Sequence, residues 1–130
     1  MTKYYQLSHA HFQNRLWRNE LEMNQQEVEF FLKIIEELPI ESEIFRGAEK
    51  KVFINQFHHF QRLIQKLLEE VSKFEKEIAS GVLNDNIMDK EQRLDHQYLQ
   101  EEMDYYEQDY RITKAKFKAF LVSVEEPIID

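Results

Sequence analysis

The residues of this sequence that could hold a metal ion are its five histidines and its many carboxylates. A carboxylate-bridged di-iron site needs Glu-x-x-His on two helices, but no histidine here follows a glutamate by three residues. The His-x-x-x-His spacing of helical zinc sites is absent too. The sequence therefore predicts no metal site and no bound cofactor.

The densest group of carboxylates is the run from Glu101 to Asp109, in which acidic residues are interspersed with tyrosines. A buried cluster of this kind could hold a cation, or act as a general acid or base with a raised pKa. A charged run on a helix is more typical of a solvated face. We therefore expect the tyrosine rings to turn inward, with their hydroxyl groups at the rim.

No arrangement of residues indicates a nucleophile or a phosphate-binding loop. The chain has no cysteine and only two glycines, and none of its serines lies in a Gly-x-Ser-x-Gly elbow. Long helices joined by short turns also leave little room for a concave pocket. We therefore expect that the protein is not an enzyme.

Composition narrows the range of partners. The chain carries 25 Asp and Glu against 17 Lys and Arg, a formal net charge of −8, and its basic residues form no stripe. Because such a field repels phosphate backbones, we expect no nucleic-acid partner. The apolar runs are too short to cross a membrane, and residues 1–12 lack the apolar segment of a signal peptide. We expect a cytoplasmic protein.

Three helices must position these residues, because apolar side chains recur at alternating intervals of four and three in three segments. The first seam is Trp17, Leu21, Asn24, Val28, Phe31, Ile35 and Leu38. The second is Phe53, Phe57, Phe60, Ile64, Leu67, Val71, Phe74 and Ile78. The third is Leu99, Met103, Tyr106, Tyr110, Thr113, Phe117, Phe120 and Val124. We predict an all-α fold in one domain, 1–130: an up-down-up antiparallel bundle of three long helices with coiled-coil-like packing.

Turn and capping residues set the expected helix ends. Pro39 stops the first helix, because the residue before a proline is pushed out of the helical region. Gly81 suits the left-handed position that ends the second helix. Asp89 and Gln92 have the spacing of a capping box for the third helix, although Asn84 and Asp85 compete as caps. The predicted helices cover about 8–38, 43–80 and 86–122.

Two helices also carry apolar stripes outside their seams. The first repeats Leu16, Met23 and Phe30 at intervals of seven, and the third repeats Tyr98, Tyr105 and Ile112. Carboxylates lie between each stripe and its seam, which favours two separate contacts over one wide core. One contact would lie within the chain, and the other would bind a second copy or another protein. We predict that the partner-binding residues are Leu16, Met23, Phe30, Tyr98 and Tyr105.

Asn24 is the one amide within the first seam, and two interpretations of it stay open. A buried polar residue at such a position can fix the register of the helices or the choice of partner. The other interpretation is a wet spot where the seam drifts outward. Trp17, near the start of the same seam, is most simply a core residue whose N–H finds a carbonyl or water.

Three stretches of the sequence carry a resemblance to a known family. They are Leu16-Trp17 with Glu20-Leu21, residues 28–31 and 36–38, then residues 52–57, and then Asp95-His96 with Leu99, Met103 and a long amphipathic run to Phe120-Leu121. In these stretches the chain resembles an uncharacterised family of small cytosolic helical-bundle proteins from Bacteroidetes-type bacteria. It departs from that family at His58-His59 and in the acidic tyrosine run. The resemblance implies a bundle in the cytoplasm and brings no known activity or functional residue.

The sequence names no reaction, and an interaction function suits it best. We expect a non-enzymatic scaffold or protein-interaction module that associates through helix faces, as a homodimer or with another protein. The alternative from another class is a sensor with a metal or small molecule bound in the bundle core. Such a sensor would be purified with its metal or chromophore.

Overall fold

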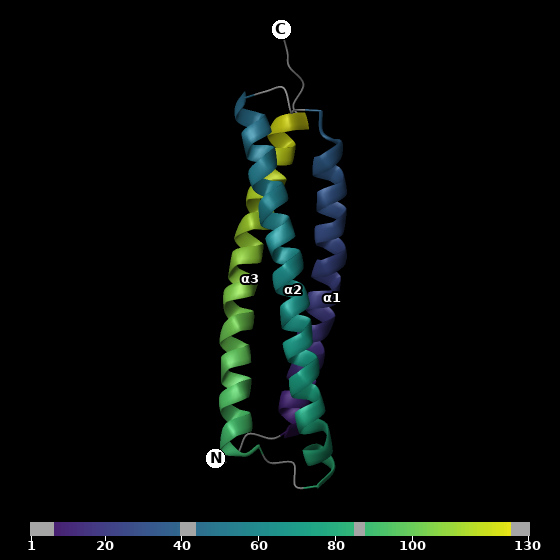
Figure 1. Ribbon diagram of the computed structural model, residues 1–130, viewed down its shortest axis with the longest axis vertical. Coiled ribbons are helices and arrows are strands. Elements are labelled where there is room, and N and C mark those ends of the chain that lie inside the picture. The colour runs from purple at the N-terminus through teal and green to yellow at the C-terminus, as the bar shows by residue number, and fades with distance from the viewer. Residues whose placement is uncertain (1–6, 40–43, 85–87, 126–130) are drawn as a thin grey trace.

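Three long helices make up nearly all of the chain that the computed structural model describes, which is residues 7–39, 44–84 and 88–125. They are α1 (Leu7–Glu37), α2 (Ile44–Asn84) and α3 (Lys90–Glu125). The helices lie side by side in a slender rod, and α2 runs opposite to α1 and α3 (Figure 1). The predicted all-α, up-down-up antiparallel bundle is therefore confirmed.

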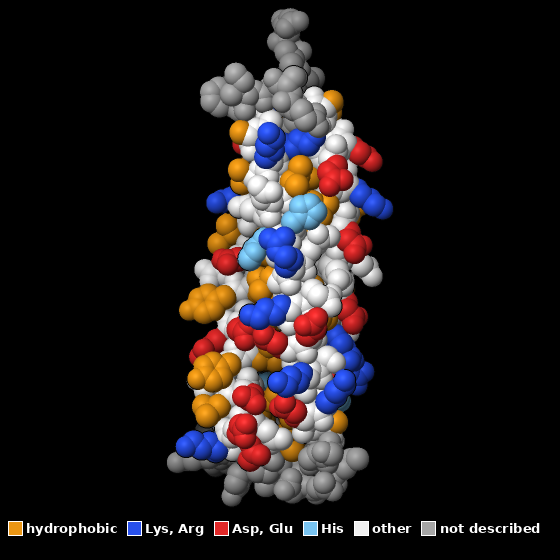
Figure 2. Space-filling view, viewed as in Figure 1, with side chains coloured by type: hydrophobic (Ala, Val, Ile, Leu, Met, Phe, Trp, Pro, Cys, Tyr) orange, Lys and Arg blue, Asp and Glu red, His pale blue; other side chains and the backbone are white. Residues whose placement is uncertain are grey.

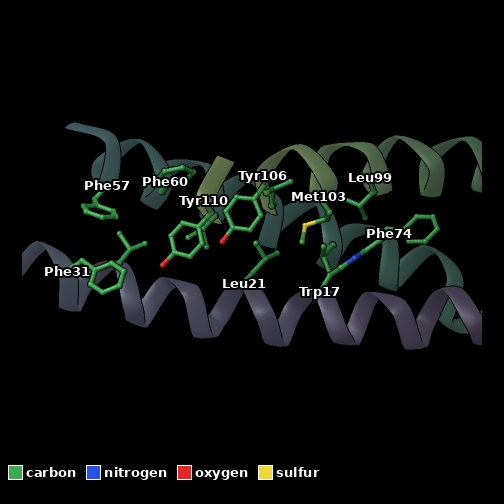
Figure 3. Close-up of a cluster of buried hydrophobic side chains, with 14 of the residues drawn as sticks. Trp17, Leu21, Phe31, Phe57, Phe60, Phe74, Leu99, Met103, Tyr106 and Tyr110 are labelled. Atoms are coloured by element: carbon green, nitrogen blue, oxygen red, sulfur yellow. The ribbon is translucent and has the colours of Figure 1, made fainter. Parts of the chain in front are cut away.

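The three seams face one another along the rod and form its core. Every residue of the second seam is buried, and Leu21 of α1 and Met103 of α3 are 0% exposed. In the first and third seams only Asn24, Leu38 and Val124 are half-buried. Figure 3 shows the labelled side chains of all three helices pointing toward one another. Each large side chain buried in this way stabilises the fold by roughly 1.5–3 kcal/mol.

A cluster of phenylalanines holds the three helices together in the half of the rod where α1 ends. The ring centroid of Phe117 lies 5.1 Å from that of Phe31 and 4.9 Å from that of Phe57. The ring of Phe53 packs edge-on to Phe117 at 5.4 Å. Edge-to-face contacts of this kind add roughly 0.5–1.5 kcal/mol beyond the burial of area. The cluster therefore helps to set the axial register of the three helices.

The second and third helices depart from their predicted ends. α2 continues through Gly81 to Asn84, so the prediction that Gly81 ends this helix is wrong. Glycine costs a helix interior only about 1 kcal/mol relative to alanine, which is too little to stop a helix by itself. α3 begins at Lys90 and not near residue 86, and it continues to Glu125, beyond the predicted end near residue 122.

Asp89 caps the first turn of α3. The backbone N–H of Gln92 donates a hydrogen bond to Asp89 Oδ1 at 2.8 Å, and the N–H of Asp89 donates to Gln92 Oε1 at 3.1 Å. This reciprocal pair is the predicted capping box. Of the two competing caps, Asn84 is the last residue of α2, and Asp85 lies outside the described residues.

Lys50 closes the corner between α1 and α2, a role that the sequence did not indicate. Its side chain is only 4% exposed, and its Nζ donates a hydrogen bond to the backbone oxygen of Leu38 at 2.8 Å. Leu38 follows the last residue of α1, where carbonyl groups lack partners within the helix. A cation at this end also interacts favourably with the helix dipole.

Candidate functional site

The histidines do not converge on a chemical site. His96 is half-buried, stacked on Trp17 at 5.4 Å between ring centroids and lying 5.7 Å from the ring of Phe74. Burial lowers the pKa of His96 below its ordinary value, and the nearby His9 lowers it further, so the neutral ring is favoured. Within the described ranges, no group of three or more His, Asp or Glu side chains is placed to hold a metal ion.

The apolar stripe predicted on α1 is exposed, and it is longer than the predicted set of three residues. Leu16 is 48%, Met23 69% and Phe30 59% exposed. Phe12, four residues before Leu16, is 60% exposed, and Ile34, four residues after Phe30, is half-buried. We call these five residues the α1 face. Its two ends were missed because only the interval of seven was followed, although an interval of four keeps to the same side of a helix.

The α1 face points away from the core of its own chain. At about 100° per residue, its five side chains project within about 20° of one line along the helix. The seam residues Leu21 and Val28 are both 0% exposed, and they project about 140–160° away from Met23. No other part of the described chain covers Met23 or Phe30, which are more than half exposed.

A second exposed stripe follows α3. Tyr98 is 63% and Tyr105 73% exposed, and Leu94 and Ile112 are 45% exposed on the same side of the helix. We call these four residues the α3 stripe. In Figure 2, hydrophobic side chains gather along the left edge, over α3.

The α1 face and the α3 stripe lie on different sides of the rod. Tyr98 lines a recess together with Lys73 and Phe74 of α2, so the α3 stripe lies toward α2. The opposite flank of α3 faces α1, where Lys114 contacts Glu27. The five predicted partner-binding residues are therefore divided into two groups, Leu16, Met23 and Phe30 on one face and Tyr98 and Tyr105 on another. Their role in binding stays a prediction.

A layer of polar contacts joins α1 to α3 beside the α1 face. Asn24 Nδ2 donates a hydrogen bond to the hydroxyl of Tyr106 at 2.6 Å, and the hydroxyl of Tyr110 donates to Glu27 Oε1 at 2.6 Å. Figure 3 shows both tyrosine hydroxyl groups directed toward α1. Of the two interpretations of Asn24, the structure therefore supports the paired polar residue over the wet spot, although Asn24 is half-buried.

The same layer compensates the negative charge of Glu27. Lys114 Nζ lies 2.8 Å from Glu27 Oε1. Burial by itself raises the pKa of Glu27, but the hydrogen bonds from Lys114 and Tyr110 outweigh it and hold the pKa below its ordinary value. Glu27 is therefore ionised at neutral pH and already has its cation within the chain.

Two pairs of carboxyl groups lie where α3 meets its neighbours. Burial and a hydrogen bond with Glu20 of α1 raise the pKa of Glu107 to about 7. Burial and Glu102 of α3 likewise raise the pKa of Glu70 of α2. Lys66 Nζ lies 3.8 Å from Glu70 and 3.9 Å from Glu102, so this second pair has a cation beside it.

These pairs show that the acidic run of α3 is more than a solvated face. Tyr106 and Tyr110 turn inward with polar partners at their hydroxyl groups, as expected. Tyr105 turns outward, which corrects the expectation that the tyrosines of the run face inward. The arrangement gives α3 a contact between two carboxyl groups with each neighbouring helix. It provides no nucleophile and no oxyanion-binding group within the described residues.

Comparisons of the chain with protein-family models, with curated proteins and with solved structures give no match. The resemblance to a bacterial family therefore stays a prediction. Among the described residues, no helix combines the length and the apolar character that crossing a membrane requires.

Proposed function

We propose that this chain is a non-enzymatic interaction module of the cytoplasm that pairs with a second copy of itself through the α1 face. The observation that carries the proposal is the 59–69% exposure of Phe12, Met23 and Phe30 on a bundle whose three seams are already buried. A helix that served only its own core would carry polar residues at these positions. Exposed apolar patches of this kind mark binding surfaces on soluble proteins.

The α1 face is long and narrow, and its size predicts a weak dimer contact. From Phe12 to Ile34 it runs for about 33 Å along the helix, at 1.5 Å per residue. A strip of that length and about 10 Å in width covers about 330 Å² on each copy, which is less than the ~800 Å² per partner of a standard specific complex and is the size of a small, weak interface.

The flanks of the α1 face let two copies of an acidic chain approach. On the flank away from α3, Asn19 and Gln26 carry no charge. On the flank toward α3, Glu27 is already paired with Lys114. Glu20 also lies on the flank toward α3, and it is hydrogen-bonded to Glu107.

The proposal is tested by measuring solution mass with light scattering after size exclusion. The mass of the wild-type chain is expected to rise toward twice 15.9 kDa as the loaded concentration increases, and a variant with Met23→Glu and Phe30→Glu is expected to stay at 15.9 kDa. Both positions are exposed in the single chain, so far-UV circular dichroism of the variant should stay that of the wild type. A double variant that keeps the dimer mass would overturn the proposal.

A matched control is available on the other exposed stripe. Tyr98→Glu with Tyr105→Glu places the same number of charges on α3, on side chains that are equally exposed. This control is expected to keep the wild-type mass. If it becomes monomeric while the α1 variant stays dimeric, the contact uses the α3 stripe and the proposed surface is wrong.

A further inference from the structure

The α1 face has a symmetry that bears on how two copies would meet. Measured from Met23, Leu16 and Phe30 lie seven residues before and after it, and Phe12 and Ile34 lie eleven residues before and after it. The spacing is therefore the same when α1 is followed in either direction. Because these five side chains also share one side of the helix, the pattern coincides with itself when the helix is reversed about Met23.

We infer that the two copies pair antiparallel along α1, with the two-fold axis passing beside Met23. The inference rests on the proposed self-association and adds its geometry. A closed two-fold dimer uses the same surface patch on both subunits. In the antiparallel pair, Met23 faces Met23 of the second copy, Leu16 faces Phe30, and Phe12 faces Ile34.

The sizes of the facing side chains favour this orientation over a parallel one. In the antiparallel pair every large ring meets a smaller aliphatic side chain, and the two methionines meet at the centre. The gap between the helices is therefore filled evenly along the α1 face. In a parallel pair each residue would face its own copy. Phenylalanine would then meet phenylalanine at Phe12 and Phe30, while only smaller aliphatic side chains would meet at Leu16 and Ile34. Well-packed interfaces do not leave such gaps.

The flanks of the α1 face are compatible with the antiparallel pair. A two-fold axis perpendicular to the helices brings each flank against its own copy. On the flank away from α3, Asn19 then meets Gln26 of the second copy, and two amides can exchange hydrogen bonds. On the flank toward α3, Glu20 meets Glu27 of the second copy. Lys114 compensates the charge of Glu27, and Glu20 is hydrogen-bonded to Glu107 of its own chain.

Single cysteines test the orientation, because the chain has no cysteine of its own and each introduced thiol is therefore the only one. A disulfide requires Cα atoms within about 7 Å. In the antiparallel pair, Met23→Cys lies beside its own copy and is expected to form a cross-linked dimer under mild oxidation. Phe12→Cys would be about 33 Å from its copy at 1.5 Å per residue and is expected to stay uncross-linked.

A mixed experiment provides a second readout that does not depend on replacing Met23. Leu16→Cys and Phe30→Cys chains, mixed as dimers and oxidised, are expected to give the mixed disulfide in preference to either self-disulfide. If Phe12→Cys cross-links as readily as Met23→Cys, the copies are parallel, and the inference fails while self-association stands. If the mass is dimeric but none of these thiols cross-links, α1 is not the contact. A monomeric mass at all concentrations would remove the proposed function as well.

Discussion

Asn24 Nδ2 donates a hydrogen bond to the hydroxyl oxygen of Tyr106 at 2.6 Å, and this contact links α1 to α3 across the edge of the core. The tyrosine side is deeply placed, since Tyr106 is only 1% exposed. A hydroxyl in such a place loses water when the chain folds, so its protein partner matters more than on the surface. Asn24 therefore supplies a hydrogen-bond partner for a buried hydroxyl group.

Replacing Asn24 with leucine should leave the Tyr106 hydroxyl without this partner. We expect the free energy of unfolding to fall by about 1–3 kcal/mol, the cost of an unsatisfied buried polar group. Urea unfolding followed by circular dichroism measures it. Adding Tyr106→Phe removes the second polar group, and the double variant should recover most of the loss. Equal stability of Asn24→Leu and wild type would show that the hydrogen bond contributes nothing.

Lys50 should contribute more to the stability of the fold than Lys51, its exposed neighbour in sequence. Lys50→Met keeps an apolar side chain of similar length but leaves the backbone oxygen of Leu38 without its donor. We expect a loss of about 1.5–3 kcal/mol in the free energy of unfolding, as for other hydrogen bonds to charged groups. Lys51→Met, at an exposed position, is the matched control and should change stability little. Similar effects of the two substitutions would contradict the role given to Lys50.

The contact between Glu20 and Glu107 should make the fold less stable as the solution becomes alkaline. The pKa of Glu107 is raised from 4.5 to about 7 in the folded chain. Between these pH values the folded chain holds a proton that the unfolded chain has released. The stabilisation of the folded chain that comes from the raised pKa is therefore complete below about pH 4.5 and is lost as the pH rises through about 7. Glu70, whose pKa is also raised, acts in the same direction.

Glu107→Gln should reduce this pH dependence. The amide can donate to Glu20 at every pH, so the variant should be more stable than wild type at pH 8 and about equal to it near pH 5. Thermal unfolding across this range measures the difference. Glu101→Gln changes an exposed carboxylate of the same run and should keep the wild-type profile. A wild-type profile for Glu107→Gln as well would mean that its carboxyl is not protonated in the folded chain.

Phe30 and Phe31 are adjacent and identical in type, but they should respond differently to substitution. Phe31 is 7% exposed, and its ring packs 5.1 Å from that of Phe117. Phe31→Ala should cost about 3–5 kcal/mol of unfolding free energy, as for other buried aromatic residues. Phe30→Ala should cost far less in dilute solution, where chains are single, and should weaken association instead. A large loss of stability for Phe30→Ala in single chains would place its ring in the core.

The sequence predicted the architecture well because one periodic signal decides it. The second seam, Phe53 to Ile78, is buried throughout, since eight apolar residues at four-three spacing leave the helix no other face to bury. The capping box at Asp89 was also predictable, because its two hydrogen bonds depend only on residues three apart. The end of α2 was not, because a glycine lowers helix stability without deciding where the chain turns.

Contacts between helices were beyond the sequence for a different reason. Asn14 is 0% exposed, and its Nδ2 donates to the backbone oxygen of Val71 at 3.3 Å, yet nothing near it in sequence indicates this partner. Asn14 lies three residues before Trp17 and therefore continues the first seam, so its burial could have been predicted from the sequence although its partner could not. Tyr98 and Met23 lie on different sides of the rod because one flank of α3 faces α1 and the other faces α2. A periodic pattern does not specify which flank faces which helix.

The most direct test of the account is sedimentation equilibrium of the unmodified chain over a range of concentrations. Pairing through the α1 face predicts masses that rise from 15.9 kDa toward twice that value as the concentration increases. The α1 face is covered when two copies meet, so a species larger than a dimer would have to use the α3 stripe. A mass of 15.9 kDa at every concentration would contradict the account.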